Sequence, residues 1–309
     1  MQARLGAGAW AGLAWFLGFA AVAAEPLTVS AVADGVYVHY GVQEDSGPGN
    51  LGDIANLGFI VGERCVAVVD TGGTAEVGRR LRAAVRRVTP LPVCYVINTH
   101  VHPDHIFGNA AFEGDQPTFV GHAKLPQAMA ARGGTYVHAL ERDFGAVAQG
   151  SRVIAPTTLV QTETELDLGG RVLKLRAWPT AHTDNDLTVF DAKTGTLFLS
   201  DLLFVERIPV VDGSLRGWLA IQPQIVALQP ARAIPGHGMV KNSLEDAVAA
   251  QERYLSTLRK EVKAAIKEGM TLRQAVDRLG TSEQGKWLLW DSFHKRNVTA
   301  AYAELEWED

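Results

Sequence analysis

The chain has 309 residues, of which 47% are hydrophobic and 20% charged, and its formal net charge is −5. This composition is typical of a globular protein with a large core, organised as one domain or two. The charge balance provides no basic field for a phosphate backbone, so we do not expect nucleic acid as a partner.

The N-terminus predicts export. Arg4 precedes twenty uncharged residues, LGAGAWAGLAWFLGFAAVAA, which end in small residues typical of a signal-peptidase site near Ala23 or Ala24. A stretch of this length could also span a bilayer as a retained anchor, but its cleavage-like end favours removal. We therefore expect residues 1–24 to be a signal peptide, and the mature protein to be periplasmic or secreted, without a stable membrane anchor.

The first half of the mature chain predicts strands and one helix. Strands are expected at 28–41, 56–62, 64–73 and 92–99, and a helix should begin after Thr74, whose side chain can cap it. Cys65 and Cys94 lie in two of the apolar strands and are expected to be buried. Their spacing fits no structural zinc site, and whether they pair remains open.

The second half has a similar plan. Strands are expected at 171–186, 186–191, 196–201 and 231–238, each ending in a turn that carries histidine or aspartate. Helices should follow at 243–269 and 271–279, and then a tryptophan-rich segment in which Trp287, Trp290, Phe293 and Trp307 are assigned to packing. The prediction is one domain over residues 25–240, with a helical extension over 241–309 packed on it.

The stretch NTHVHPDHIFGN, residues 98–109, concentrates metal-ligand residue types after a buried strand. His100 and His102 are two residues apart, so in extended backbone both can face one ion. Asp104 and His105 start the next segment and can face a second ion. A polar loop without metal is the alternative. His182, Asp201 and His237 follow at three later strand ends, where each alone would more often be structural.

Together these motifs resemble the metallo-β-lactamase superfamily. HVHPDH matches its HxHxDH signature, and VDTGG, AHTDND, LFLSD and PGHG stand in the expected order within residues 28–240. The resemblance implies an α/β fold, an αββα sandwich with extra C-terminal helices here, and two Zn²⁺ ions. It assigns His100, His102 and His182 to one ion, Asp104, His105 and His237 to the other, and Asp201 to both. Asp70 resembles a supporting aspartate that orients a ligand.

The subclass is also suggested by resemblance. The bridging aspartate looks like that of glyoxalase II and lactonases, and residues 204–218 and 294–308 look like the quinoprotein relay system zinc metallohydrolases, which are exported and associated with pyrroloquinoline quinone dehydrogenase systems. In such a site a bridging hydroxide would cleave a small-molecule ester, thioester, lactone or amide, with Asp104 handling its proton. The alternatives are β-lactam hydrolysis, which Asp201 disfavours, and a non-catalytic role in binding a quinone cofactor or a partner.

Substrate contacts are less defined by the sequence. Arg207 follows Asp201 by six residues and could clamp a substrate carboxylate, or it could form a surface ion pair with its neighbour Glu206. Tyr40, Trp218 and Asn185 are further candidates for the border of the cleft.

Overall fold

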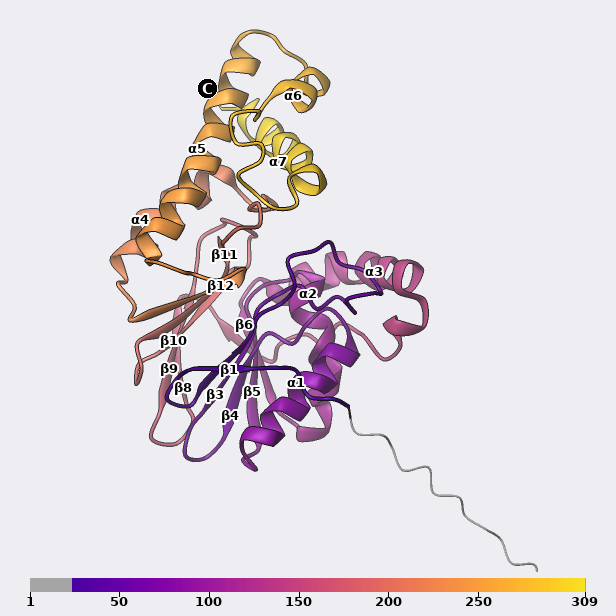
Figure 1. Ribbon diagram of the computed structural model, residues 1–309, viewed down its shortest axis with the longest axis vertical. Helices are drawn as coiled ribbons and strands as arrows, with labels where there is room; N and C mark the ends of the chain where they lie inside the picture. The colour runs from indigo at the N-terminus through magenta and orange to yellow at the C-terminus, as the bar shows by residue number, and fades with distance from the viewer. Residues whose placement is uncertain (1–23, 309) are drawn as a thin grey trace, which may run out of the picture.

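The computed structural model describes residues 24–308, so the predicted signal peptide lies outside the described residues except for Ala24. Two β-sheets lie face to face with helices on their outer sides (Figure 1), which confirms the predicted αββα sandwich. Within the described range, no helix combines the length and apolar character needed to cross a membrane.

The first sheet has seven strands in the order β1 to β7, antiparallel from β1 to β4 and parallel from β4 to β7. The second has the order β12-β11-β10-β9-β8, in which only β12 is parallel to its neighbour. The strands are β1 (Ser30–Ala33), β2 (Val36–His39), β3 (Leu57–Val61), β4 (Val66–Val69), β5 (Val93–Asn98), β6 (Thr118–His122), β7 (Thr158–Val160), β8 (Glu163–Asp167), β9 (Val172–Ala177), β10 (Leu187–Asp191), β11 (Thr196–Phe204) and β12 (Arg232–His237).

The helices cover the outer faces of the sheets and form the C-terminal extension. They are α1 (Ala75–Val88), α2 (Pro103–Ile106), α3 (Leu125–Phe144), α4 (Leu215–Ala227), α5 (Leu244–Lys267), α6 (Leu272–Arg278) and α7 (Trp290–Leu305), with 3-10 segments at Phe107–Asp115 and Gly145–Ala148. Thr74 caps α1 by accepting a hydrogen bond from the Val77 amide, as the sequence predicts.

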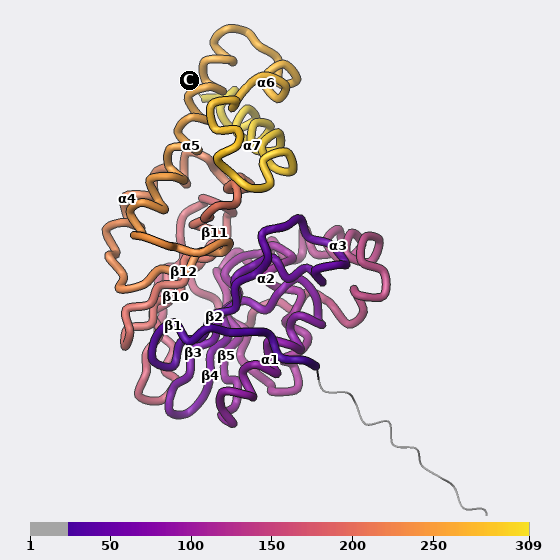
Figure 2. Tube along the Cα trace, viewed as in Figure 1, coloured from indigo at the N-terminus to yellow at the C-terminus, as the bar shows by residue number. Residues whose placement is uncertain are grey.

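Alternation along the strands explains how the layers pack. In β4 every residue is buried: Ala67 and Val69 join the core between the sheets, whereas Val66 and Val68 face α1. Burial on both faces therefore gives β4 its continuous apolar sequence. On the other side, β11, α4, α5 and α7 contribute to one hydrophobic cluster, so the C-terminal helices share a core with the second sheet. Figure 2 shows α5 leading away from the sheets and α7 lying beside it.

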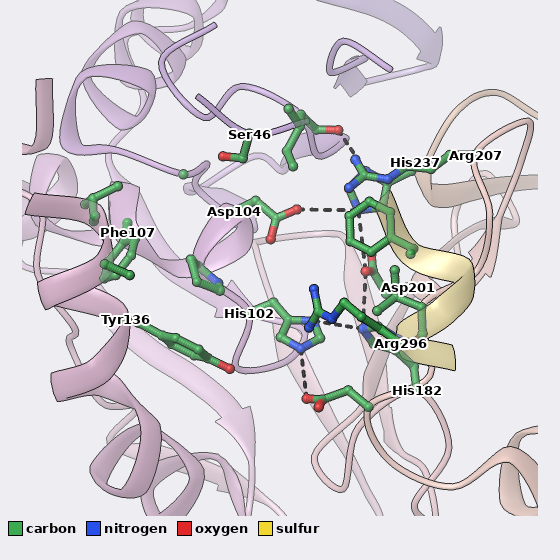
Figure 3. Close-up of a pocket in the computed structure, with 18 of the residues that line it drawn as sticks. Ser46, His102, Asp104, Phe107, Tyr136, His182, Asp201, Arg207, His237 and Arg296 are labelled. Carbon is green, nitrogen blue, oxygen red and sulfur yellow. Dashed lines mark hydrogen bonds and ion pairs between the residues drawn. The ribbon is translucent and has the colours of Figure 1, made fainter. Parts of the chain in front are cut away.

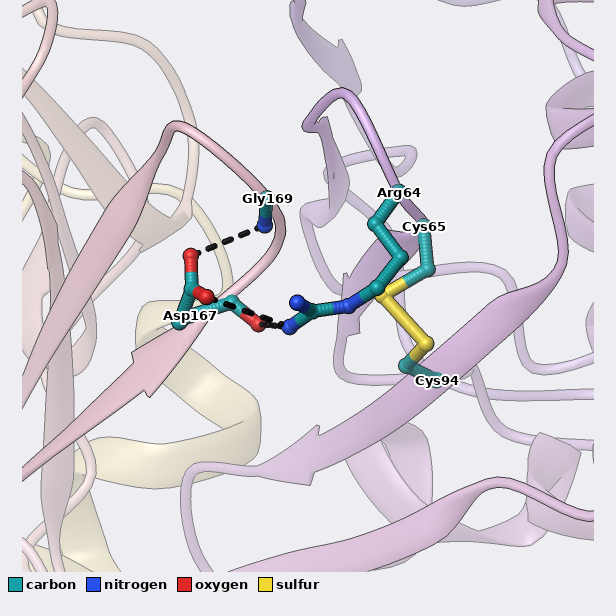
Figure 4. Close-up of a disulfide and its surroundings, with 5 residues drawn as sticks. All are labelled: Arg64, Cys65, Cys94, Asp167 and Gly169. Atoms are coloured by element: carbon teal, nitrogen blue, oxygen red, sulfur yellow. Dashed lines mark hydrogen bonds and ion pairs between the residues drawn. A yellow bond between two sulfur atoms is a disulfide. The ribbon is translucent and has the colours of Figure 1, made fainter.

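The two cysteines are joined by a disulfide (Figure 4), which answers the question that the sequence leaves open. Cys65 directly precedes β4, and Cys94 is the second residue of β5. Because β4 and β5 pair in parallel with Val66 opposite Val93, the two side chains meet across the ladder, with a Cα–Cα distance of 5.8 Å. This register depends on tertiary pairing, which the cysteine spacing does not reveal.

Candidate metal centre

All seven predicted ligand residues converge at one edge of the sandwich. His100 and His102 follow β5, Asp104 and His105 lie in α2, and His237 ends β12. His182 lies in the loop between β9 and β10, and Asp201 lies in β11. They form two adjacent groups, and Figure 3 shows the cleft that the centre faces.

The first group contains His100, His102, His182 and Asp201, with ligand atoms all within 4.8 Å of one another. His102 Nδ1 lies 3.1 Å from His100 Nε2 and 2.9 Å from His182 Nε2. Asp201 Oδ2 lies 3.3 Å from His182 Nε2. Three imidazole nitrogens and one carboxylate oxygen are thus directed at one position.

The second group contains Asp104, His105 and His237. Asp104 Oδ2 lies 3.6 Å from His105 Nε2 and 3.4 Å from His237 Nε2. Asp201 also reaches this group, because its Oδ1 is 3.2 Å from His105 Nε2 and its Oδ2 is 3.5 Å from His237 Nε2. One carboxylate therefore lies between the two groups.

The outer ring nitrogens show which atoms are free to bind a cation. His182 Nδ1 donates to the Val210 carbonyl at 2.7 Å, so its inward Nε2 carries a lone pair. His102 Nε2 lies 3.1 Å from Asp212 Oδ2, which leaves a lone pair on the inward Nδ1. Two lone pairs facing each other at 2.9 Å repel unless a cation lies between them. The residues therefore fit a metal, and a nitrogen and oxygen donor set suits zinc.

The second group fits a cation for the same reason. His237 Nδ1 donates to the Ile54 carbonyl at 2.8 Å and presents Nε2 inward. The buried His105 Nε2 and Asp201 Oδ1 have no hydrogen-bond partner among the described residues. Buried polar atoms without partners are costly, and a bound cation would satisfy both.

Burial and charge set the protonation of these groups. Burial lowers the pKa of His182 to about 4, and it holds the pKa of His100 well below its usual value, so both are neutral as a ligand must be. Burial also acts to lower the pKa of His105, but the surrounding carboxylates, Asp201 first, raise it well above its usual value, so a metal bound in the second group would displace a proton from this ring.

Asp70 supports the centre from the turn after β4. Its Oδ2 accepts from His105 Nδ1 at 2.8 Å and from the Thr99 hydroxyl at 2.7 Å, and its Oδ1 accepts from the Thr99 amide at 2.9 Å. The residue has a φ of 57°, a conformation that is strained for an aspartate and is found at sites where the surroundings enforce it.

Asp201 lies inside a strand, and not at the end of one as the sequence predicts. The sequence predicts a strand that ends at Asp201, whereas β11 continues to Phe204. The pairing of β11 with β12 is irregular around Ser200, which has a φ of 48°. Such an irregularity re-aims a side chain without ending the strand. A Cβ on Gly236 of β12 would lie 1.9 Å from Asp201 Oδ1, so only glycine fits beside this carboxylate.

The centre opens into a cleft of about 370 Å³ lined by Phe107 and Tyr136 on one side and by Arg207 and Arg296 on the other (Figure 3). Phe293 packs against the core of the C-terminal helices, as predicted, and it also lines the cleft, because α7 returns there. Trp307 is 83% exposed, so its assignment to packing is wrong. Arg207 is 3% exposed, and Glu206 instead pairs with Lys241, so a surface ion pair between neighbours is excluded.

The other three candidates for the cleft border do not line the cleft: Tyr40, Trp218 and Asn185. Trp218 is fully buried and packs edge-on against His182, so it supports a ligand from behind.

Sequence reasoning missed Asp212 and its partner Arg132. Asp212 Oδ2 hydrogen-bonds His102 and forms an ion pair with Arg132 of α3, which brings α3 to the centre. Asp212 ends the apolar run IPVVD. This pattern is similar to the other strand ends that carry aspartate, but no histidine at ligand spacing accompanies Asp212 to indicate a role at the centre.

Asn56 was also missed. It holds the turn around His237 by donating to the Pro235 and Gly238 carbonyls. Its role depends on contacts about 180 residues away in the chain, and nothing in its local sequence indicates them.

Comparisons with known proteins agree with this geometry. The model of the metallo-beta-lactamase superfamily matches residues 51–237. A linear primary-alkylsulfatase from Pseudomonas sp. (strain ATCC 19151) is 33% identical over 58 residues, which is 19% of this chain and 11% of the relative. The chain thus spans only a small part of that curated relative.

Solved structures show the same fold. The sec-alkylsulfatase Pisa1 from Pseudomonas sp. superposes with a TM-score of 0.70 and 15% identity over 91% of this chain and 50% of its own. A metallo-beta-lactamase from Pontibacter korlensis gives a TM-score of 0.60 and 16% identity over 74% of this chain and 99% of its own. The fold, the ligand geometry and the family match agree, and the chain belongs to the metallo-beta-lactamase superfamily, whose members are generally hydrolases.

Proposed function

We propose that the protein is a dinuclear zinc hydrolase that cleaves an ester, thioester, lactone or amide bond of a small molecule. The observation that carries this proposal is the convergence of two ligand groups on Asp201, which lies within 3.5 Å of histidines from both groups. A shared carboxylate between two nitrogen-rich groups favours two adjacent metals over one.

The residues around the centre have separable roles. Two zinc ions held there would supply Lewis acidity and lower the pKa of water toward neutrality. Asp104 lines the cleft with one carboxylate oxygen beside His105 and His237, and the other oxygen can hold the attacking water and accept its proton. The two cysteines are committed to a disulfide, so neither is available as a nucleophile.

Sulfate ester hydrolysis is a second candidate, favoured by the sequence match to a linear primary-alkylsulfatase and by the structural likeness to a sec-alkylsulfatase. β-Lactam hydrolysis is a third, since superfamily structures of that class share the fold. The same centre could polarise each of these bonds, so a panel of substrates distinguishes the three candidates.

We further propose an exported protein linked to a quinoprotein dehydrogenase system. The disulfide between Cys65 and Cys94 supports an oxidising compartment, where such bonds persist. The link to a dehydrogenase that uses pyrroloquinoline quinone rests on the sequence resemblance of residues 204–218 and 294–308.

The test is turnover by the zinc-loaded mature protein on aryl ester, thioester, lactone, alkyl sulfate and β-lactam substrates. We expect activity on one bond class and a loss of about 100-fold or more in kcat for Asp104→Asn, the range for a lost general base. Asp277→Asn, a change at an exposed aspartate of α6, should keep full activity. A protein shown to hold two metals that turns over none of the panel would contradict the proposal and favour a binding role.

A further inference from the structure

Two arginines flank one aromatic ring at the mouth of the cleft. The Cζ atom of Arg207 lies 5.1 Å from the ring centroid of Phe293, and that of Arg296 lies 5.7 Å from it. Arg207 follows β11, whereas Phe293 and Arg296 belong to α7. All three line the cavity that contains Asp104 and His237. The C-terminal extension therefore supplies part of the cleft wall beside the metal centre.

Arg207 is a buried cation without an acceptor of its own. No carboxylate oxygen of the described residues lies within 4 Å of its guanidinium, and its Nε is buried without a hydrogen-bond partner. Its Nη1 lies 3.3 Å from His237 Nδ1, but that nitrogen already donates its proton to the Ile54 carbonyl. An unsatisfied buried guanidinium is costly, and such groups are retained where a ligand satisfies them.

The nearby carboxylates do not serve as partners for this charge. Asp104, Asp201 and Asp45 act on Arg207 electrostatically, but Asp104 and Asp201 face the histidines of the two ligand groups. Asp45 accepts a hydrogen bond from the Ser292 hydroxyl at 2.7 Å and forms no ion pair with Arg207. Arg132 differs from Arg207 in this respect, because it forms an ion pair with Asp212 near the metal centre. Arg296 is exposed and has no ion-pair partner among residues 24–308.

We propose that Arg207 and Arg296 form a subsite for an oxyanionic group of the substrate, a carboxylate or a sulfate, beside an apolar portion that packs on Phe293. Two guanidinium forks can bind such a group with several charge-assisted hydrogen bonds. The subsite deepens the proposed function by naming an anionic substrate class. Half of it comes from α7, which lies beyond the residues that match the superfamily model.

The test measures binding without turnover. Isothermal titration calorimetry on the metal-loaded mature protein uses three probes of similar shape: 4-methylbenzoate, 4-methylbenzenesulfonate and the neutral 4-methylbenzamide. We expect at least one anion to bind more tightly than the amide, and its affinity to fall about tenfold or more in Arg207→Met and in Arg296→Met. Arg273→Met, at an exposed arginine of α6 outside the cleft, is the matched control and should bind like the wild type.

The anion that binds more tightly shows which group the subsite prefers: 4-methylbenzoate stands for a carboxylate, and 4-methylbenzenesulfonate stands for a sulfate. Equal binding of anions and amide, or anion binding that Arg296→Met leaves unchanged, would overturn the proposal, because an anion held by the metals alone does not need α7. If a thermal melt shows that Arg207→Met is unfolded, Arg207→Lys and Arg296→Met carry the test. Arginine-dependent binding without any turnover would count against the hydrolase and not against the subsite.

Discussion

The five histidines of the centre are each oriented by a hydrogen bond on the ring nitrogen that faces away from it. The acceptors differ: backbone carbonyls hold His182 and His237, carboxylates hold His102 and His105, and the Thr99 hydroxyl holds His100. Each bond selects the tautomer with its lone pair inward. At the residue scale, the centre is therefore specified as much by these acceptors as by the ligands.

Asp70 offers the sharpest test of this orientation. In Asp70→Asn, the side-chain amide can donate to His105 Nδ1, which would move the histidine proton to the inward Nε2. We expect a 10- to 100-fold loss of zinc affinity, the usual cost of losing such a partner. Competition with a chromophoric chelator measures it.

Asp167→Asn, at a half-exposed aspartate in β8, is the control and should bind zinc like the wild type. Wild-type affinity in Asp70→Asn would show that the 2.8 Å contact with His105 does not orient the ligand.

At the scale of elements, the loop between β2 and β3 forms one border of the cleft, through Ser46 and Ile54. His39, the last residue of β2, holds this loop in place, because its Nε2 lies 2.8 Å from Asp53 Oδ1. Its Nδ1 lies 2.8 Å from the Thr28 carbonyl oxygen. Both ring nitrogens can donate only when the histidine is protonated. Asp53 outweighs the effect of burial and raises the pKa of His39 above its usual value.

This pKa shift predicts a pH-dependent stability. Because the folded pKa of His39 is raised, its contribution is complete below about pH 6.5 and is lost as the pH rises through the folded pKa. His39→Gln should therefore lose about 1.5 kcal/mol at pH 5.5, or roughly 3 to 6 °C in Tm, and much less at pH 9. Thermal melts of both proteins at the two pH values measure the difference.

His138→Gln, at a histidine on the exposed side of α3, is the control and should show no such pH-dependent gap. A gap for His39→Gln that is the same at both pH values, or larger at pH 9, would contradict the assignment.

The sequence predicts local features of this molecule better than its long-range ones. The periodicities predict the strand and helix segments, and the resemblance of the local motifs to the superfamily implies their αββα arrangement. Four of the ligand residues stand in one hexapeptide, so local sequence suffices to find them. The pairing of Cys65 with Cys94 and the approach of Arg296 to the cleft depend on which elements become neighbours. Phe293 shows the limit: its aromatic side chain predicts packing, which the structure confirms, but only the path of α7 reveals that the same ring also lines the cleft.

At the scale of the whole molecule, the centre lies across the two sheets. The first sheet and its α2 helix supply the ligands from His100 to His105, and the second sheet supplies His182, Asp201 and His237. A metal bound there would join the two halves of the sandwich, which the unfolded chain cannot do. Metal binding should therefore add to global stability by linkage.

We expect chelation of zinc to lower the free energy of unfolding by about 4 kcal/mol when free zinc had been about 1,000-fold above its Kd. For a chain of this size the Tm should fall by roughly 10 °C, and added zinc should restore it. Calorimetric melts before chelation, after it and after zinc is returned measure the effect. Asp70→Asn keeps all seven ligands but should bind zinc more weakly. It should therefore need a 10- to 100-fold higher free zinc concentration to gain the same stability. An unchanged Tm would contradict this expectation, because it would mean that no zinc had bound or that the unfolded chain binds zinc as tightly as the folded protein does.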